Sequence, residues 1–397
     1  MRRLTDRLLV CVYMALAALP VLAMTAHIKD HRLEGAFPPA PPPKLAFGAV
    51  RSEAYQHQLT GWFEGSLGLR AWSIWSDNTL LYHAFGETKW GSHVQIGHGG
   101  MLFERDDITY FNKSDAMLPA PADVERLADD IAKLQALLRA RGKALVPIFV
   151  PSKTTFYRAS VPSLWTRDLG DPRPSTRRIY DGLRRALEAR RVIFVDGIEL
   201  LQTSPEPRDV LWGRDARHFS NYAGCLCVRA TLERYAQLTA TPPIEYPCNK
   251  SFAHAKRTHS DLDLFRLLNA WGVPRDPIGR DVDHAPFPER PAPHAPRAMW
   301  ISSSFGWVMM GDAELSRRLP QLHIDYYNRT VFEPAAGASF EVKPFDESWN
   351  KVFPTRELYV LELNETYVTP GSAPGSFFGA DAVASLLAAF ERDPAAR

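Results

Sequence analysis

Amphipathic helices alternate with short apolar strands through the middle of this 397-residue chain. Residues 124–141 repeat apolar side chains at helical spacing, and the apolar run 144–150 follows at once. Residues 176–190 show the same pattern and lead into a second apolar run, 192–195. Apolar strands joined by helices are typical of a parallel sheet covered on both faces. The chain is therefore expected to form an α/β fold with α/β/α layers and a mostly parallel sheet. The pattern also predicts strands at 298–302, 322–326 and 358–363, and helices at 221–238 and 381–390.

Two segments carry the residue types of a serine nucleophile and its base. In WGRDARHFSNYAG, Asp215 stands three residues before His218, so one loop can present an imidazole base and the carboxylate that orients it. In AMWISSSFGW, Ser304 lies where an apolar strand ends in a turn, a place that exposes a hydroxyl for attack. Ser302 and Ser303 are rival nucleophiles. The candidate catalytic residues are therefore Ser304, His218 and Asp215.

Several motifs between residues 37 and 368 resemble those of the alginate O-acetyltransferase AlgJ/AlgX-like family, whose members have an SGNH hydrolase-like fold. VQIGHGGMLFE is similar to the family's V-x-x-G-K-D-G-W-L-F, and VPIFVPSKTTFY to its strand followed by P-x-K. DARHFSNYAG is similar to D-T-H-W-N-x-x-G, and WISSSFG to G-D/T-S-F. The serine directly before Phe305 takes the nucleophile position of the last motif, which again indicates Ser304.

The chain departs from these motifs near the proposed acid. The family spacing D-x-H would place the aspartate at Ala216, and Asp215 stands one place earlier. This arrangement fits a one-residue slip in the loop, the D-x-x-H spacing of ordinary SGNH hydrolases, or an inactive member of the family. Phe219 replaces the motif's tryptophan, and Ser302 and Ser303 replace its glycine and its acidic or threonine residue.

The resemblance implies an O-acetyltransferase that acetylates hydroxyls of an exopolysaccharide through an acetyl-serine intermediate. It also implies a partner, a membrane-bound O-acyltransferase that supplies the acetyl group. No cofactor and no metal are expected; Asp281, Asp283 and His284 are interpreted as solvent-facing residues of a proline-rich loop. Two alternatives remain open. One is a polysaccharide acetyl esterase with the same triad, and the other is a non-catalytic scaffold or polysaccharide-binding member of an acetylation complex.

The N-terminal segment combines an apolar run with preceding arginines. Residues 8–26 are uncharged and long enough to span a bilayer, and Arg2, Arg3 and Arg7 precede them. The positive-inside rule then places the N-terminus in the cytoplasm and the rest of the chain in the bacterial periplasm, anchored to the inner membrane. A cleaved signal peptide is the alternative, because residues 21–23 offer a cleavage site. The expected domains are an anchor or signal segment at 1–30, a proline-rich linker at 31–50 and a catalytic domain at 51–397.

Charge and cysteine content narrow the remaining possibilities. The net charge of +2, without a lysine- or arginine-rich block, gives no reason to expect nucleic-acid binding. In an oxidising compartment, Cys248 would pair with Cys225 or Cys227, and packing of reduced cysteines is the alternative. Residues 55–85 are helical in pattern, and their aromatic side chains are expected to cover the core, with a sugar-stacking surface as the alternative.

Overall fold

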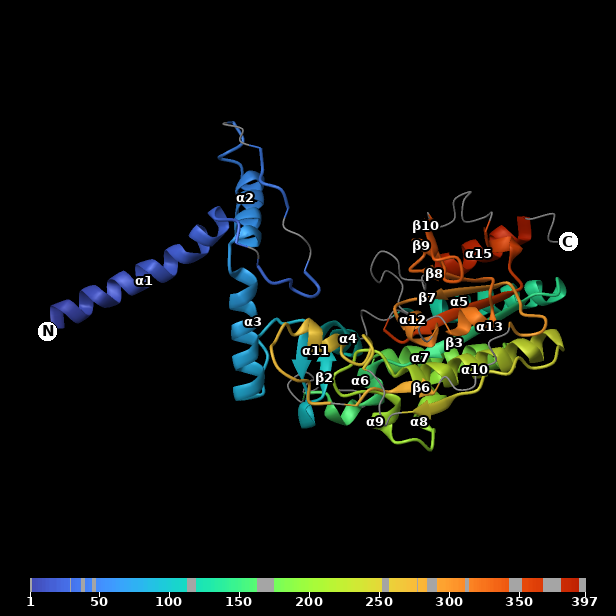
Figure 1. Ribbon diagram of the computed structural model, residues 1–397. Helices are drawn as coiled ribbons and strands as arrows, with labels where there is room; N and C mark the ends of the chain where they lie inside the picture. Colours follow the sequence, from blue (N-terminus) through green and yellow to red (C-terminus); the bar gives the residue numbers. More distant parts are fainter. Residues whose placement is uncertain are drawn as a thin grey trace. The chain divides into compact units, whose positions relative to one another are not determined.

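The protein is represented by a computed structural model, which divides into two units that are described separately (Figure 1). The first unit comprises Met1–Val94 and Phe265–Val273, and the second comprises Gln95–Leu264 and Pro274–Arg397. The domain boundary expected at residue 50 differs from this division, which groups residues 51–94 with the N-terminal segment. The structure describes residues 2–28, 30–36, 40–44, 48–112, 119–162, 175–251, 257–276, 278–283, 291–310, 314–342, 352–366 and 380–392. Parts of the expected linker, 37–39 and 45–47, lie outside these ranges.

The first unit is helical. Its helices are α1 (Arg2–Thr25), α2 (Glu53–Ser66), α3 (Arg70–Leu80) and the short π-helix η1 (Leu81–Phe85). Within the described residues, one helix is long and apolar enough to cross a membrane, and it is α1, over Thr5–Thr25. This helix contains the apolar run predicted from the sequence and makes it a candidate membrane span.

The helix expected over residues 55–85 is interrupted between α2 and α3. α2 ends at Ser66, where Leu67 leaves the helical conformation, and Leu69, with a left-handed backbone (φ 61°), directly precedes α3. At Gly68 the chain passes so close to α1 that an added Cβ would lie 2.6 Å from the Cβ of Ala23. Tyr82 is buried as expected, but Phe63 and Trp72 are 41% and 43% exposed, so the aromatic side chains of this segment cover the core only in part.

Seven strands of the second unit form one sheet, in the order β10-β9-β8-β7-β11-β3-β4. Four pairings are parallel: β8 with β7, β7 with β11, β11 with β3, and β3 with β4. β9 pairs antiparallel with β8 and with β10. The sheet is therefore mixed but mostly parallel. The strands are β3 (Ala144–Val150), β4 (Val195–Asp196), β7 (Ala298–Ser302), β8 (Leu322–Tyr326), β9 (Thr330–Glu333), β10 (Ala338–Glu341) and β11 (Leu358–Asn364).

Helices cover both faces of this sheet, because alternate side chains of each strand point to opposite faces. Val146 and Ile148 of β3 pack in one core, and Leu145 and Phe149 of the same strand pack in the other. The first core is closed by α8 (Gly197–Gln202), α9 (Arg208–Leu211), α10 (Asn221–Thr239), α12 (Phe305–Met310) and α13 (Glu314–Arg318). The second is closed by α5 (Pro121–Ala140), α7 (Ser175–Ala189) and α15 (Ala380–Arg392).

The elements predicted from periodicity agree closely with these bounds. The strands expected at 144–150, 298–302 and 322–326 begin and end as predicted, while β4 is shorter than the run 192–195 suggested. The remaining short elements are β1 (Val94–Ile96), η2 (His98–Gly100), β2 (Leu102–Glu104), α4 (Arg105–Phe111), α6 (Lys153–Phe156), η4 (Arg158–Ser160), β5 (Asn249–Ser251), α11 (Asp263–Leu267), β6 (Asp281–Asp283) and η6 (Phe353–Thr355).

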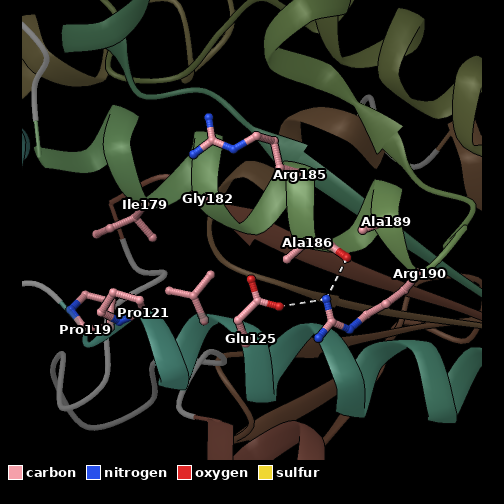
Figure 2. A pocket seen from close by; sticks show the side chains of 10 residues that line it. Pro119, Pro121, Glu125, Ile179, Gly182, Arg185, Ala186, Ala189 and Arg190 are labelled. Carbon is pink, nitrogen blue, oxygen red and sulfur yellow. Dashed lines mark hydrogen bonds and ion pairs between the residues drawn. The ribbon is translucent and has the colours of Figure 1, made fainter.

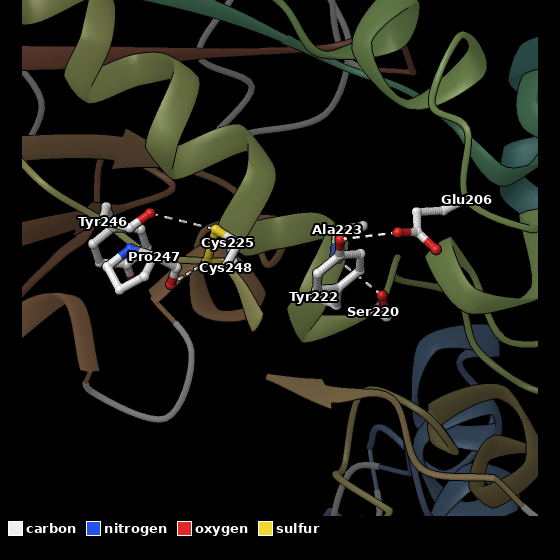
Figure 3. The surroundings of a disulfide bond; sticks show 8 residues. All are labelled: Glu206, Ser220, Tyr222, Ala223, Cys225, Tyr246, Pro247 and Cys248. Carbon is white, nitrogen blue, oxygen red and sulfur yellow. Dashed lines mark hydrogen bonds between the residues drawn. A yellow bond between two sulfur atoms is a disulfide. The ribbon is translucent and has the colours of Figure 1, made fainter. Parts of the chain in front are cut away.

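A disulfide joins Cys225 of α10 to Cys248 (Figure 3). Of the two pairings that the sequence allowed, the structure forms this one. Cys227 is a buried free thiol whose pKa burial raises to about 12. Cys11, in α1, is free and exposed.

Candidate active site

The carboxyl ends of the parallel strands meet at one edge of the sheet, where open α/β sheets place their functional residues. Ser304 lies there, two residues after β7 and directly before α12. Ser302 and Ser303 are buried, whereas Ser304 is partly exposed. Of the three candidate nucleophiles, Ser304 is therefore the one that the turn presents to solvent.

Three side chains from distant parts of the chain form a hydrogen-bonded series. Ser304 Oγ lies 2.7 Å from His218 Nε2, and His218 Nδ1 lies 2.5 Å from Asp263 Oδ2. A carboxylate that accepts a hydrogen bond from Nδ1–H favours the tautomer whose Nε2 is free to accept the serine proton. The geometry is that of a nucleophile, its base and an orienting acid.

Asp263 itself is fixed by backbone donors. Its Oδ1 accepts the N–H of Arg217 at 2.6 Å and that of Leu264 at 2.8 Å. The carboxylate thus bonds to the residue before His218 as well as to the His218 ring, which ties its position to the histidine loop. Phe305 packs edge-on against His218, with ring centroids 4.6 Å apart, and limits the orientations that the imidazole can adopt.

Asp215 does not occupy the position predicted for it. Its side chain is fully buried, and its Oδ2 accepts the backbone N–H of Asp276 at 2.8 Å. Burial raises the pKa of this carboxyl. The structure places Asp263, not Asp215, against the His218 ring, which corrects the prediction; Asp215 instead connects its loop to the segment at Asp276.

Lys153 connects this loop to the end of β3. Its side chain is 1% exposed, and Nζ donates to the carbonyls of Gly213 (3.0 Å), Arg214 (2.8 Å) and Ala216 (2.5 Å). Burial lowers the pKa of Lys153 to about 7, against the opposing effect of nearby aspartates such as Asp263. Three bonds from one ammonium group hold the loop in the conformation that presents His218.

A buried hydrogen bond between Ser303 and Glu362 fixes the turn that carries Ser304. Glu362 is fully buried on β11, and its carboxylate accepts bonds from the hydroxyl of Ser303 and, at 3.2 Å, from its backbone N–H. Ser303 Oγ in turn accepts the N–H of Phe305 at 3.3 Å. These contacts direct the Ser303 side chain inward, which explains why the adjacent Ser304 hydroxyl faces outward.

A cavity of about 440 Å³ lies between α5 and α7, where Arg190 bonds to Glu125 and to the carbonyl of Ala186 (Figure 2), and its lining includes none of the residues around Ser304. Among the described residues, no group of three or more His, Cys, Asp or Glu could hold a metal ion. His284 lies outside those residues.

Sequence reasoning missed Asp263, Lys153's buried position and the role of Glu362. Asp263 follows His218 by 45 residues in the chain, in the segment SDLDLF, which carries no motif. Lys153 stands in a P-x-K motif, but an exposed loop lysine fits the sequence at least as well as a functional one. Glu362 stands in VLELNETYV, which resembles the family's closing strand with its glutamate, and a carboxylate inside an apolar strand was a further signal.

The comparisons with known proteins agree with the motifs. Residues 94–268 match the family described as "SGNH hydrolase-like domain, acetyltransferase AlgX". No curated protein sequence matches the chain. The matched residues include His218 and Asp263 but end before Ser304, so the nucleophile's assignment depends on the geometry described above.

Three solved structures are distantly similar. The O-acetyltransferase domain of Pseudomonas putida AlgJ has a TM-score of 0.44 and 13% identity, covering 74% of this chain and 98% of that chain. Pseudomonas aeruginosa AlgX has a TM-score of 0.38 and 12% identity, and the match covers 69% of this chain and 62% of that chain. Bacillus cereus PatB1, solved with a sulfonyl adduct, has a TM-score of 0.41 and 11% identity, and the match covers 67% of this chain and 97% of that chain. The predicted SGNH-like α/β fold is confirmed by the domain match together with the observed sheet.

Proposed function

We propose that this chain transfers acetyl groups to hydroxyls of an exopolysaccharide through an acetyl-serine on Ser304. The match of residues 94–268 to an SGNH hydrolase-like acetyltransferase domain supports this proposal. The observation that carries this proposal is the continuous series from Ser304 through His218 to Asp263 at the carboxyl edge of the sheet. A serine hydroxyl is a weak nucleophile without a base in contact with it, and this contact is present.

The proposed reaction has two half-reactions. Ser304 Oγ attacks the acetyl carbonyl of a donor while His218 Nε2 accepts the serine proton; His218 then gives that proton to the leaving group as the carbonyl–leaving-group bond breaks. A sugar hydroxyl next attacks the acetyl-serine, its proton passes to His218, and the released Ser304 Oγ recovers it. Asp263 keeps the Nδ1 proton in place and stabilises the imidazolium throughout.

We place this reaction in the bacterial periplasm, with α1 as an inner-membrane anchor. The apolar length of α1 and the arginines before it support this placement. The Cys225–Cys248 disulfide supports an oxidising compartment as well. A membrane-bound O-acyltransferase is the proposed supplier of acetyl groups across the membrane.

The test is transfer to a sugar by the purified full-length chain. The protein is incubated with 4-nitrophenyl acetate and with oligosaccharides of several exopolysaccharides, and ester-linked acetyl groups on the sugar are detected by mass spectrometry. We expect transfer to at least one oligosaccharide, faster donor consumption in its presence, and loss of both in Ser304→Ala. Hydrolysis of a pre-acetylated oligosaccharide without transfer would identify an esterase instead. Neither activity, with unaltered polymer acetylation in cells that carry Ser304→Ala, would identify a scaffold.

A further inference from the structure

Tyr327 touches the nucleophile turn in two ways. It directly follows β8, the strand beside β7, at the same edge of the sheet as Ser304. Its backbone N–H donates to the carbonyl of Ser302 at 3.1 Å, and its hydroxyl accepts the backbone N–H of Ser304 at 3.4 Å. The side chain of Tyr327 therefore lies where the amide of the nucleophile points.

The backbone of Tyr327 is unusual for this residue type. Its φ is 53°, and that of the following Asn328 is 51°. A bulky residue in the left-handed region costs of order 1–3 kcal/mol, and such residues cluster at functional sites. The left-handed turn directs the Tyr327 side chain back toward Ser304, so the strained backbone is what makes the observed contact possible.

Acyl transfer needs donors aimed at the oxygen that becomes negative in the transition state. The N–H of Ser304 is one such donor. Its present bond to the Tyr327 hydroxyl is longer than the usual N–H···O distance of about 2.9 Å. A carbonyl oxygen bound at that usual distance from Ser304 N would take the space that Tyr327 Oη now occupies, so the phenol must shift to one side, from where its O–H can reach the oxygen.

We propose that the Tyr327 hydroxyl is the second donor of the oxyanion hole, and that it donates its hydrogen to the acetyl oxygen once that oxygen replaces it at the Ser304 N–H. This inference rests on the proposed function of Ser304. The phenol keeps its proton: the hydrogen bond stabilises the oxyanion while Ser304 Oγ bonds to the carbonyl carbon, and it weakens as the leaving group departs and the carbonyl re-forms.

The neighbouring Tyr326 provides a matched control. Its ring contacts Trp307 and Phe332, with centroids 6.0 and 6.1 Å away, and no bond to Ser304 is recorded for it among the described contacts. Tyr326→Phe and Tyr327→Phe each delete one hydroxyl from adjacent residues and keep the ring. Phenylalanine also keeps the shape that the left-handed turn accommodates, so both variants are expected to fold.

The first experiment measures steady-state hydrolysis of 4-nitrophenyl acetate by the full-length protein. For Tyr327→Phe we expect kcat to fall by about 10²- to 10³-fold with KM nearly unchanged, because the lost bond forms only in the transition state. Tyr326→Phe should stay within about two-fold of wild type. An unchanged or increased kcat in Tyr327→Phe would overturn the inference, and an increase would mark Tyr327 as a residue that blocks the site.

The second experiment uses an aryl boronic acid, whose tetrahedral adduct on Ser304 carries an oxyanion. Its inhibition constant should weaken in Tyr327→Phe by about the same factor as kcat. An equal rise in KM, or boronate affinity that stays at the wild-type value, would show a structural role and reject a donor role. If activity depends on Ser304 while the Tyr327→Phe variant keeps wild-type kcat and boronate affinity, the inference on Tyr327 is rejected and the proposed function stands. A wild-type protein inert toward both reagents, or activity that survives Ser304→Ala, would reject the proposed function and the inference with it.

Discussion

Two aspartates near His218 have different surroundings, and this difference is testable residue by residue. Asp263 contacts the imidazole, whereas Asp215 bonds to the backbone of Asp276. Asp263→Asn should lower kcat for acetyl-ester hydrolysis by about 10²- to 10⁴-fold, because an amide that donates to Nδ1 favours the wrong imidazole tautomer. Asp215→Asn retains an acceptor for the Asp276 N–H and should lose far less. Equal losses in the two variants would contradict the assignment of Asp263 as the orienting acid.

Lys153 is expected to matter for both stability and turnover. Lys153→Met removes the Nζ donor from three carbonyls and frees the loop that presents His218; a buried carbonyl left without a partner costs about 1–3 kcal/mol. The carbonyls of Gly213 and Arg214 keep a backbone donor each, so the largest loss is expected at Ala216. Urea unfolding should show a loss of about 3 kcal/mol or more, and kcat should fall with it. Lys133→Met, the same substitution on the exposed face of α5, should change stability by less than about 0.5 kcal/mol. Matching unfolding curves for the two variants would disprove this role of Lys153.

Titration of Glu362 is expected to make the free energy of unfolding depend on pH. Burial raises its pKa from 4.5 to about 7, so between these values the folded protein keeps a proton that the unfolded chain has released. The folded state then binds more protons, and the free energy of unfolding falls as pH rises from about 4.5 to about 7 and stays level above it.

Glu362→Gln removes this term, so its stability relative to wild type should rise by up to about 3 kcal/mol between pH 5 and pH 8. Urea midpoints of both proteins at the two pH values measure the difference. Glu104, whose pKa is also raised to about 7 by burial, titrates in both proteins and cancels. A difference between the proteins that is independent of pH would show that Glu362 is already ionised throughout the range.

At the scale of elements, the disulfide connects α10 to the segment that follows it. Cys225 and Cys248 are 23 residues apart, and closing a loop of this size stabilises a protein by about 3 kcal/mol. The double variant Cys225→Ala, Cys248→Ala should unfold at lower urea, and reductant should shift the wild type toward the same midpoint. Cys11→Ala, at a free and exposed cysteine, serves as the control and should respond to reductant as the wild type does. A wild-type midpoint insensitive to reductant would indicate that the bridge is absent in solution.

At the scale of the whole molecule, α1 is the candidate membrane span, and the proposed location of the protein depends on it. Its apolar stretch over Thr5–Thr25 matches the thickness of a bilayer. We expect the full-length protein to stay with inner membranes after alkaline carbonate extraction, with a periplasmic C-terminus reported by an alkaline phosphatase fusion. Intact mass should retain α1. A soluble periplasmic product trimmed near Ala23 would instead identify a cleaved signal peptide.

The sequence by itself determined the local elements of this protein and two residues of its proposed site. Strands such as β3 and β7 and helices such as α5 and α10 follow from apolar periodicity, which depends only on neighbouring residues. Ser304 and His218 lie in motifs beside such elements, and the structure brings them within hydrogen-bonding distance.

Only the tertiary structure decided the rest, because it depends on residues far apart in the chain. Asp263, the proposed orienting acid, comes from a segment without a motif, 45 residues after His218, and bonds to the His218 ring and to the N–H of Arg217. The antiparallel strands β9 and β10, the choice of Cys225 over Cys227 and the return of Tyr327 toward Ser304 have the same cause. Periodicity shows which face of an element is buried, but the partner against which that face packs is set by the free energy of the whole fold.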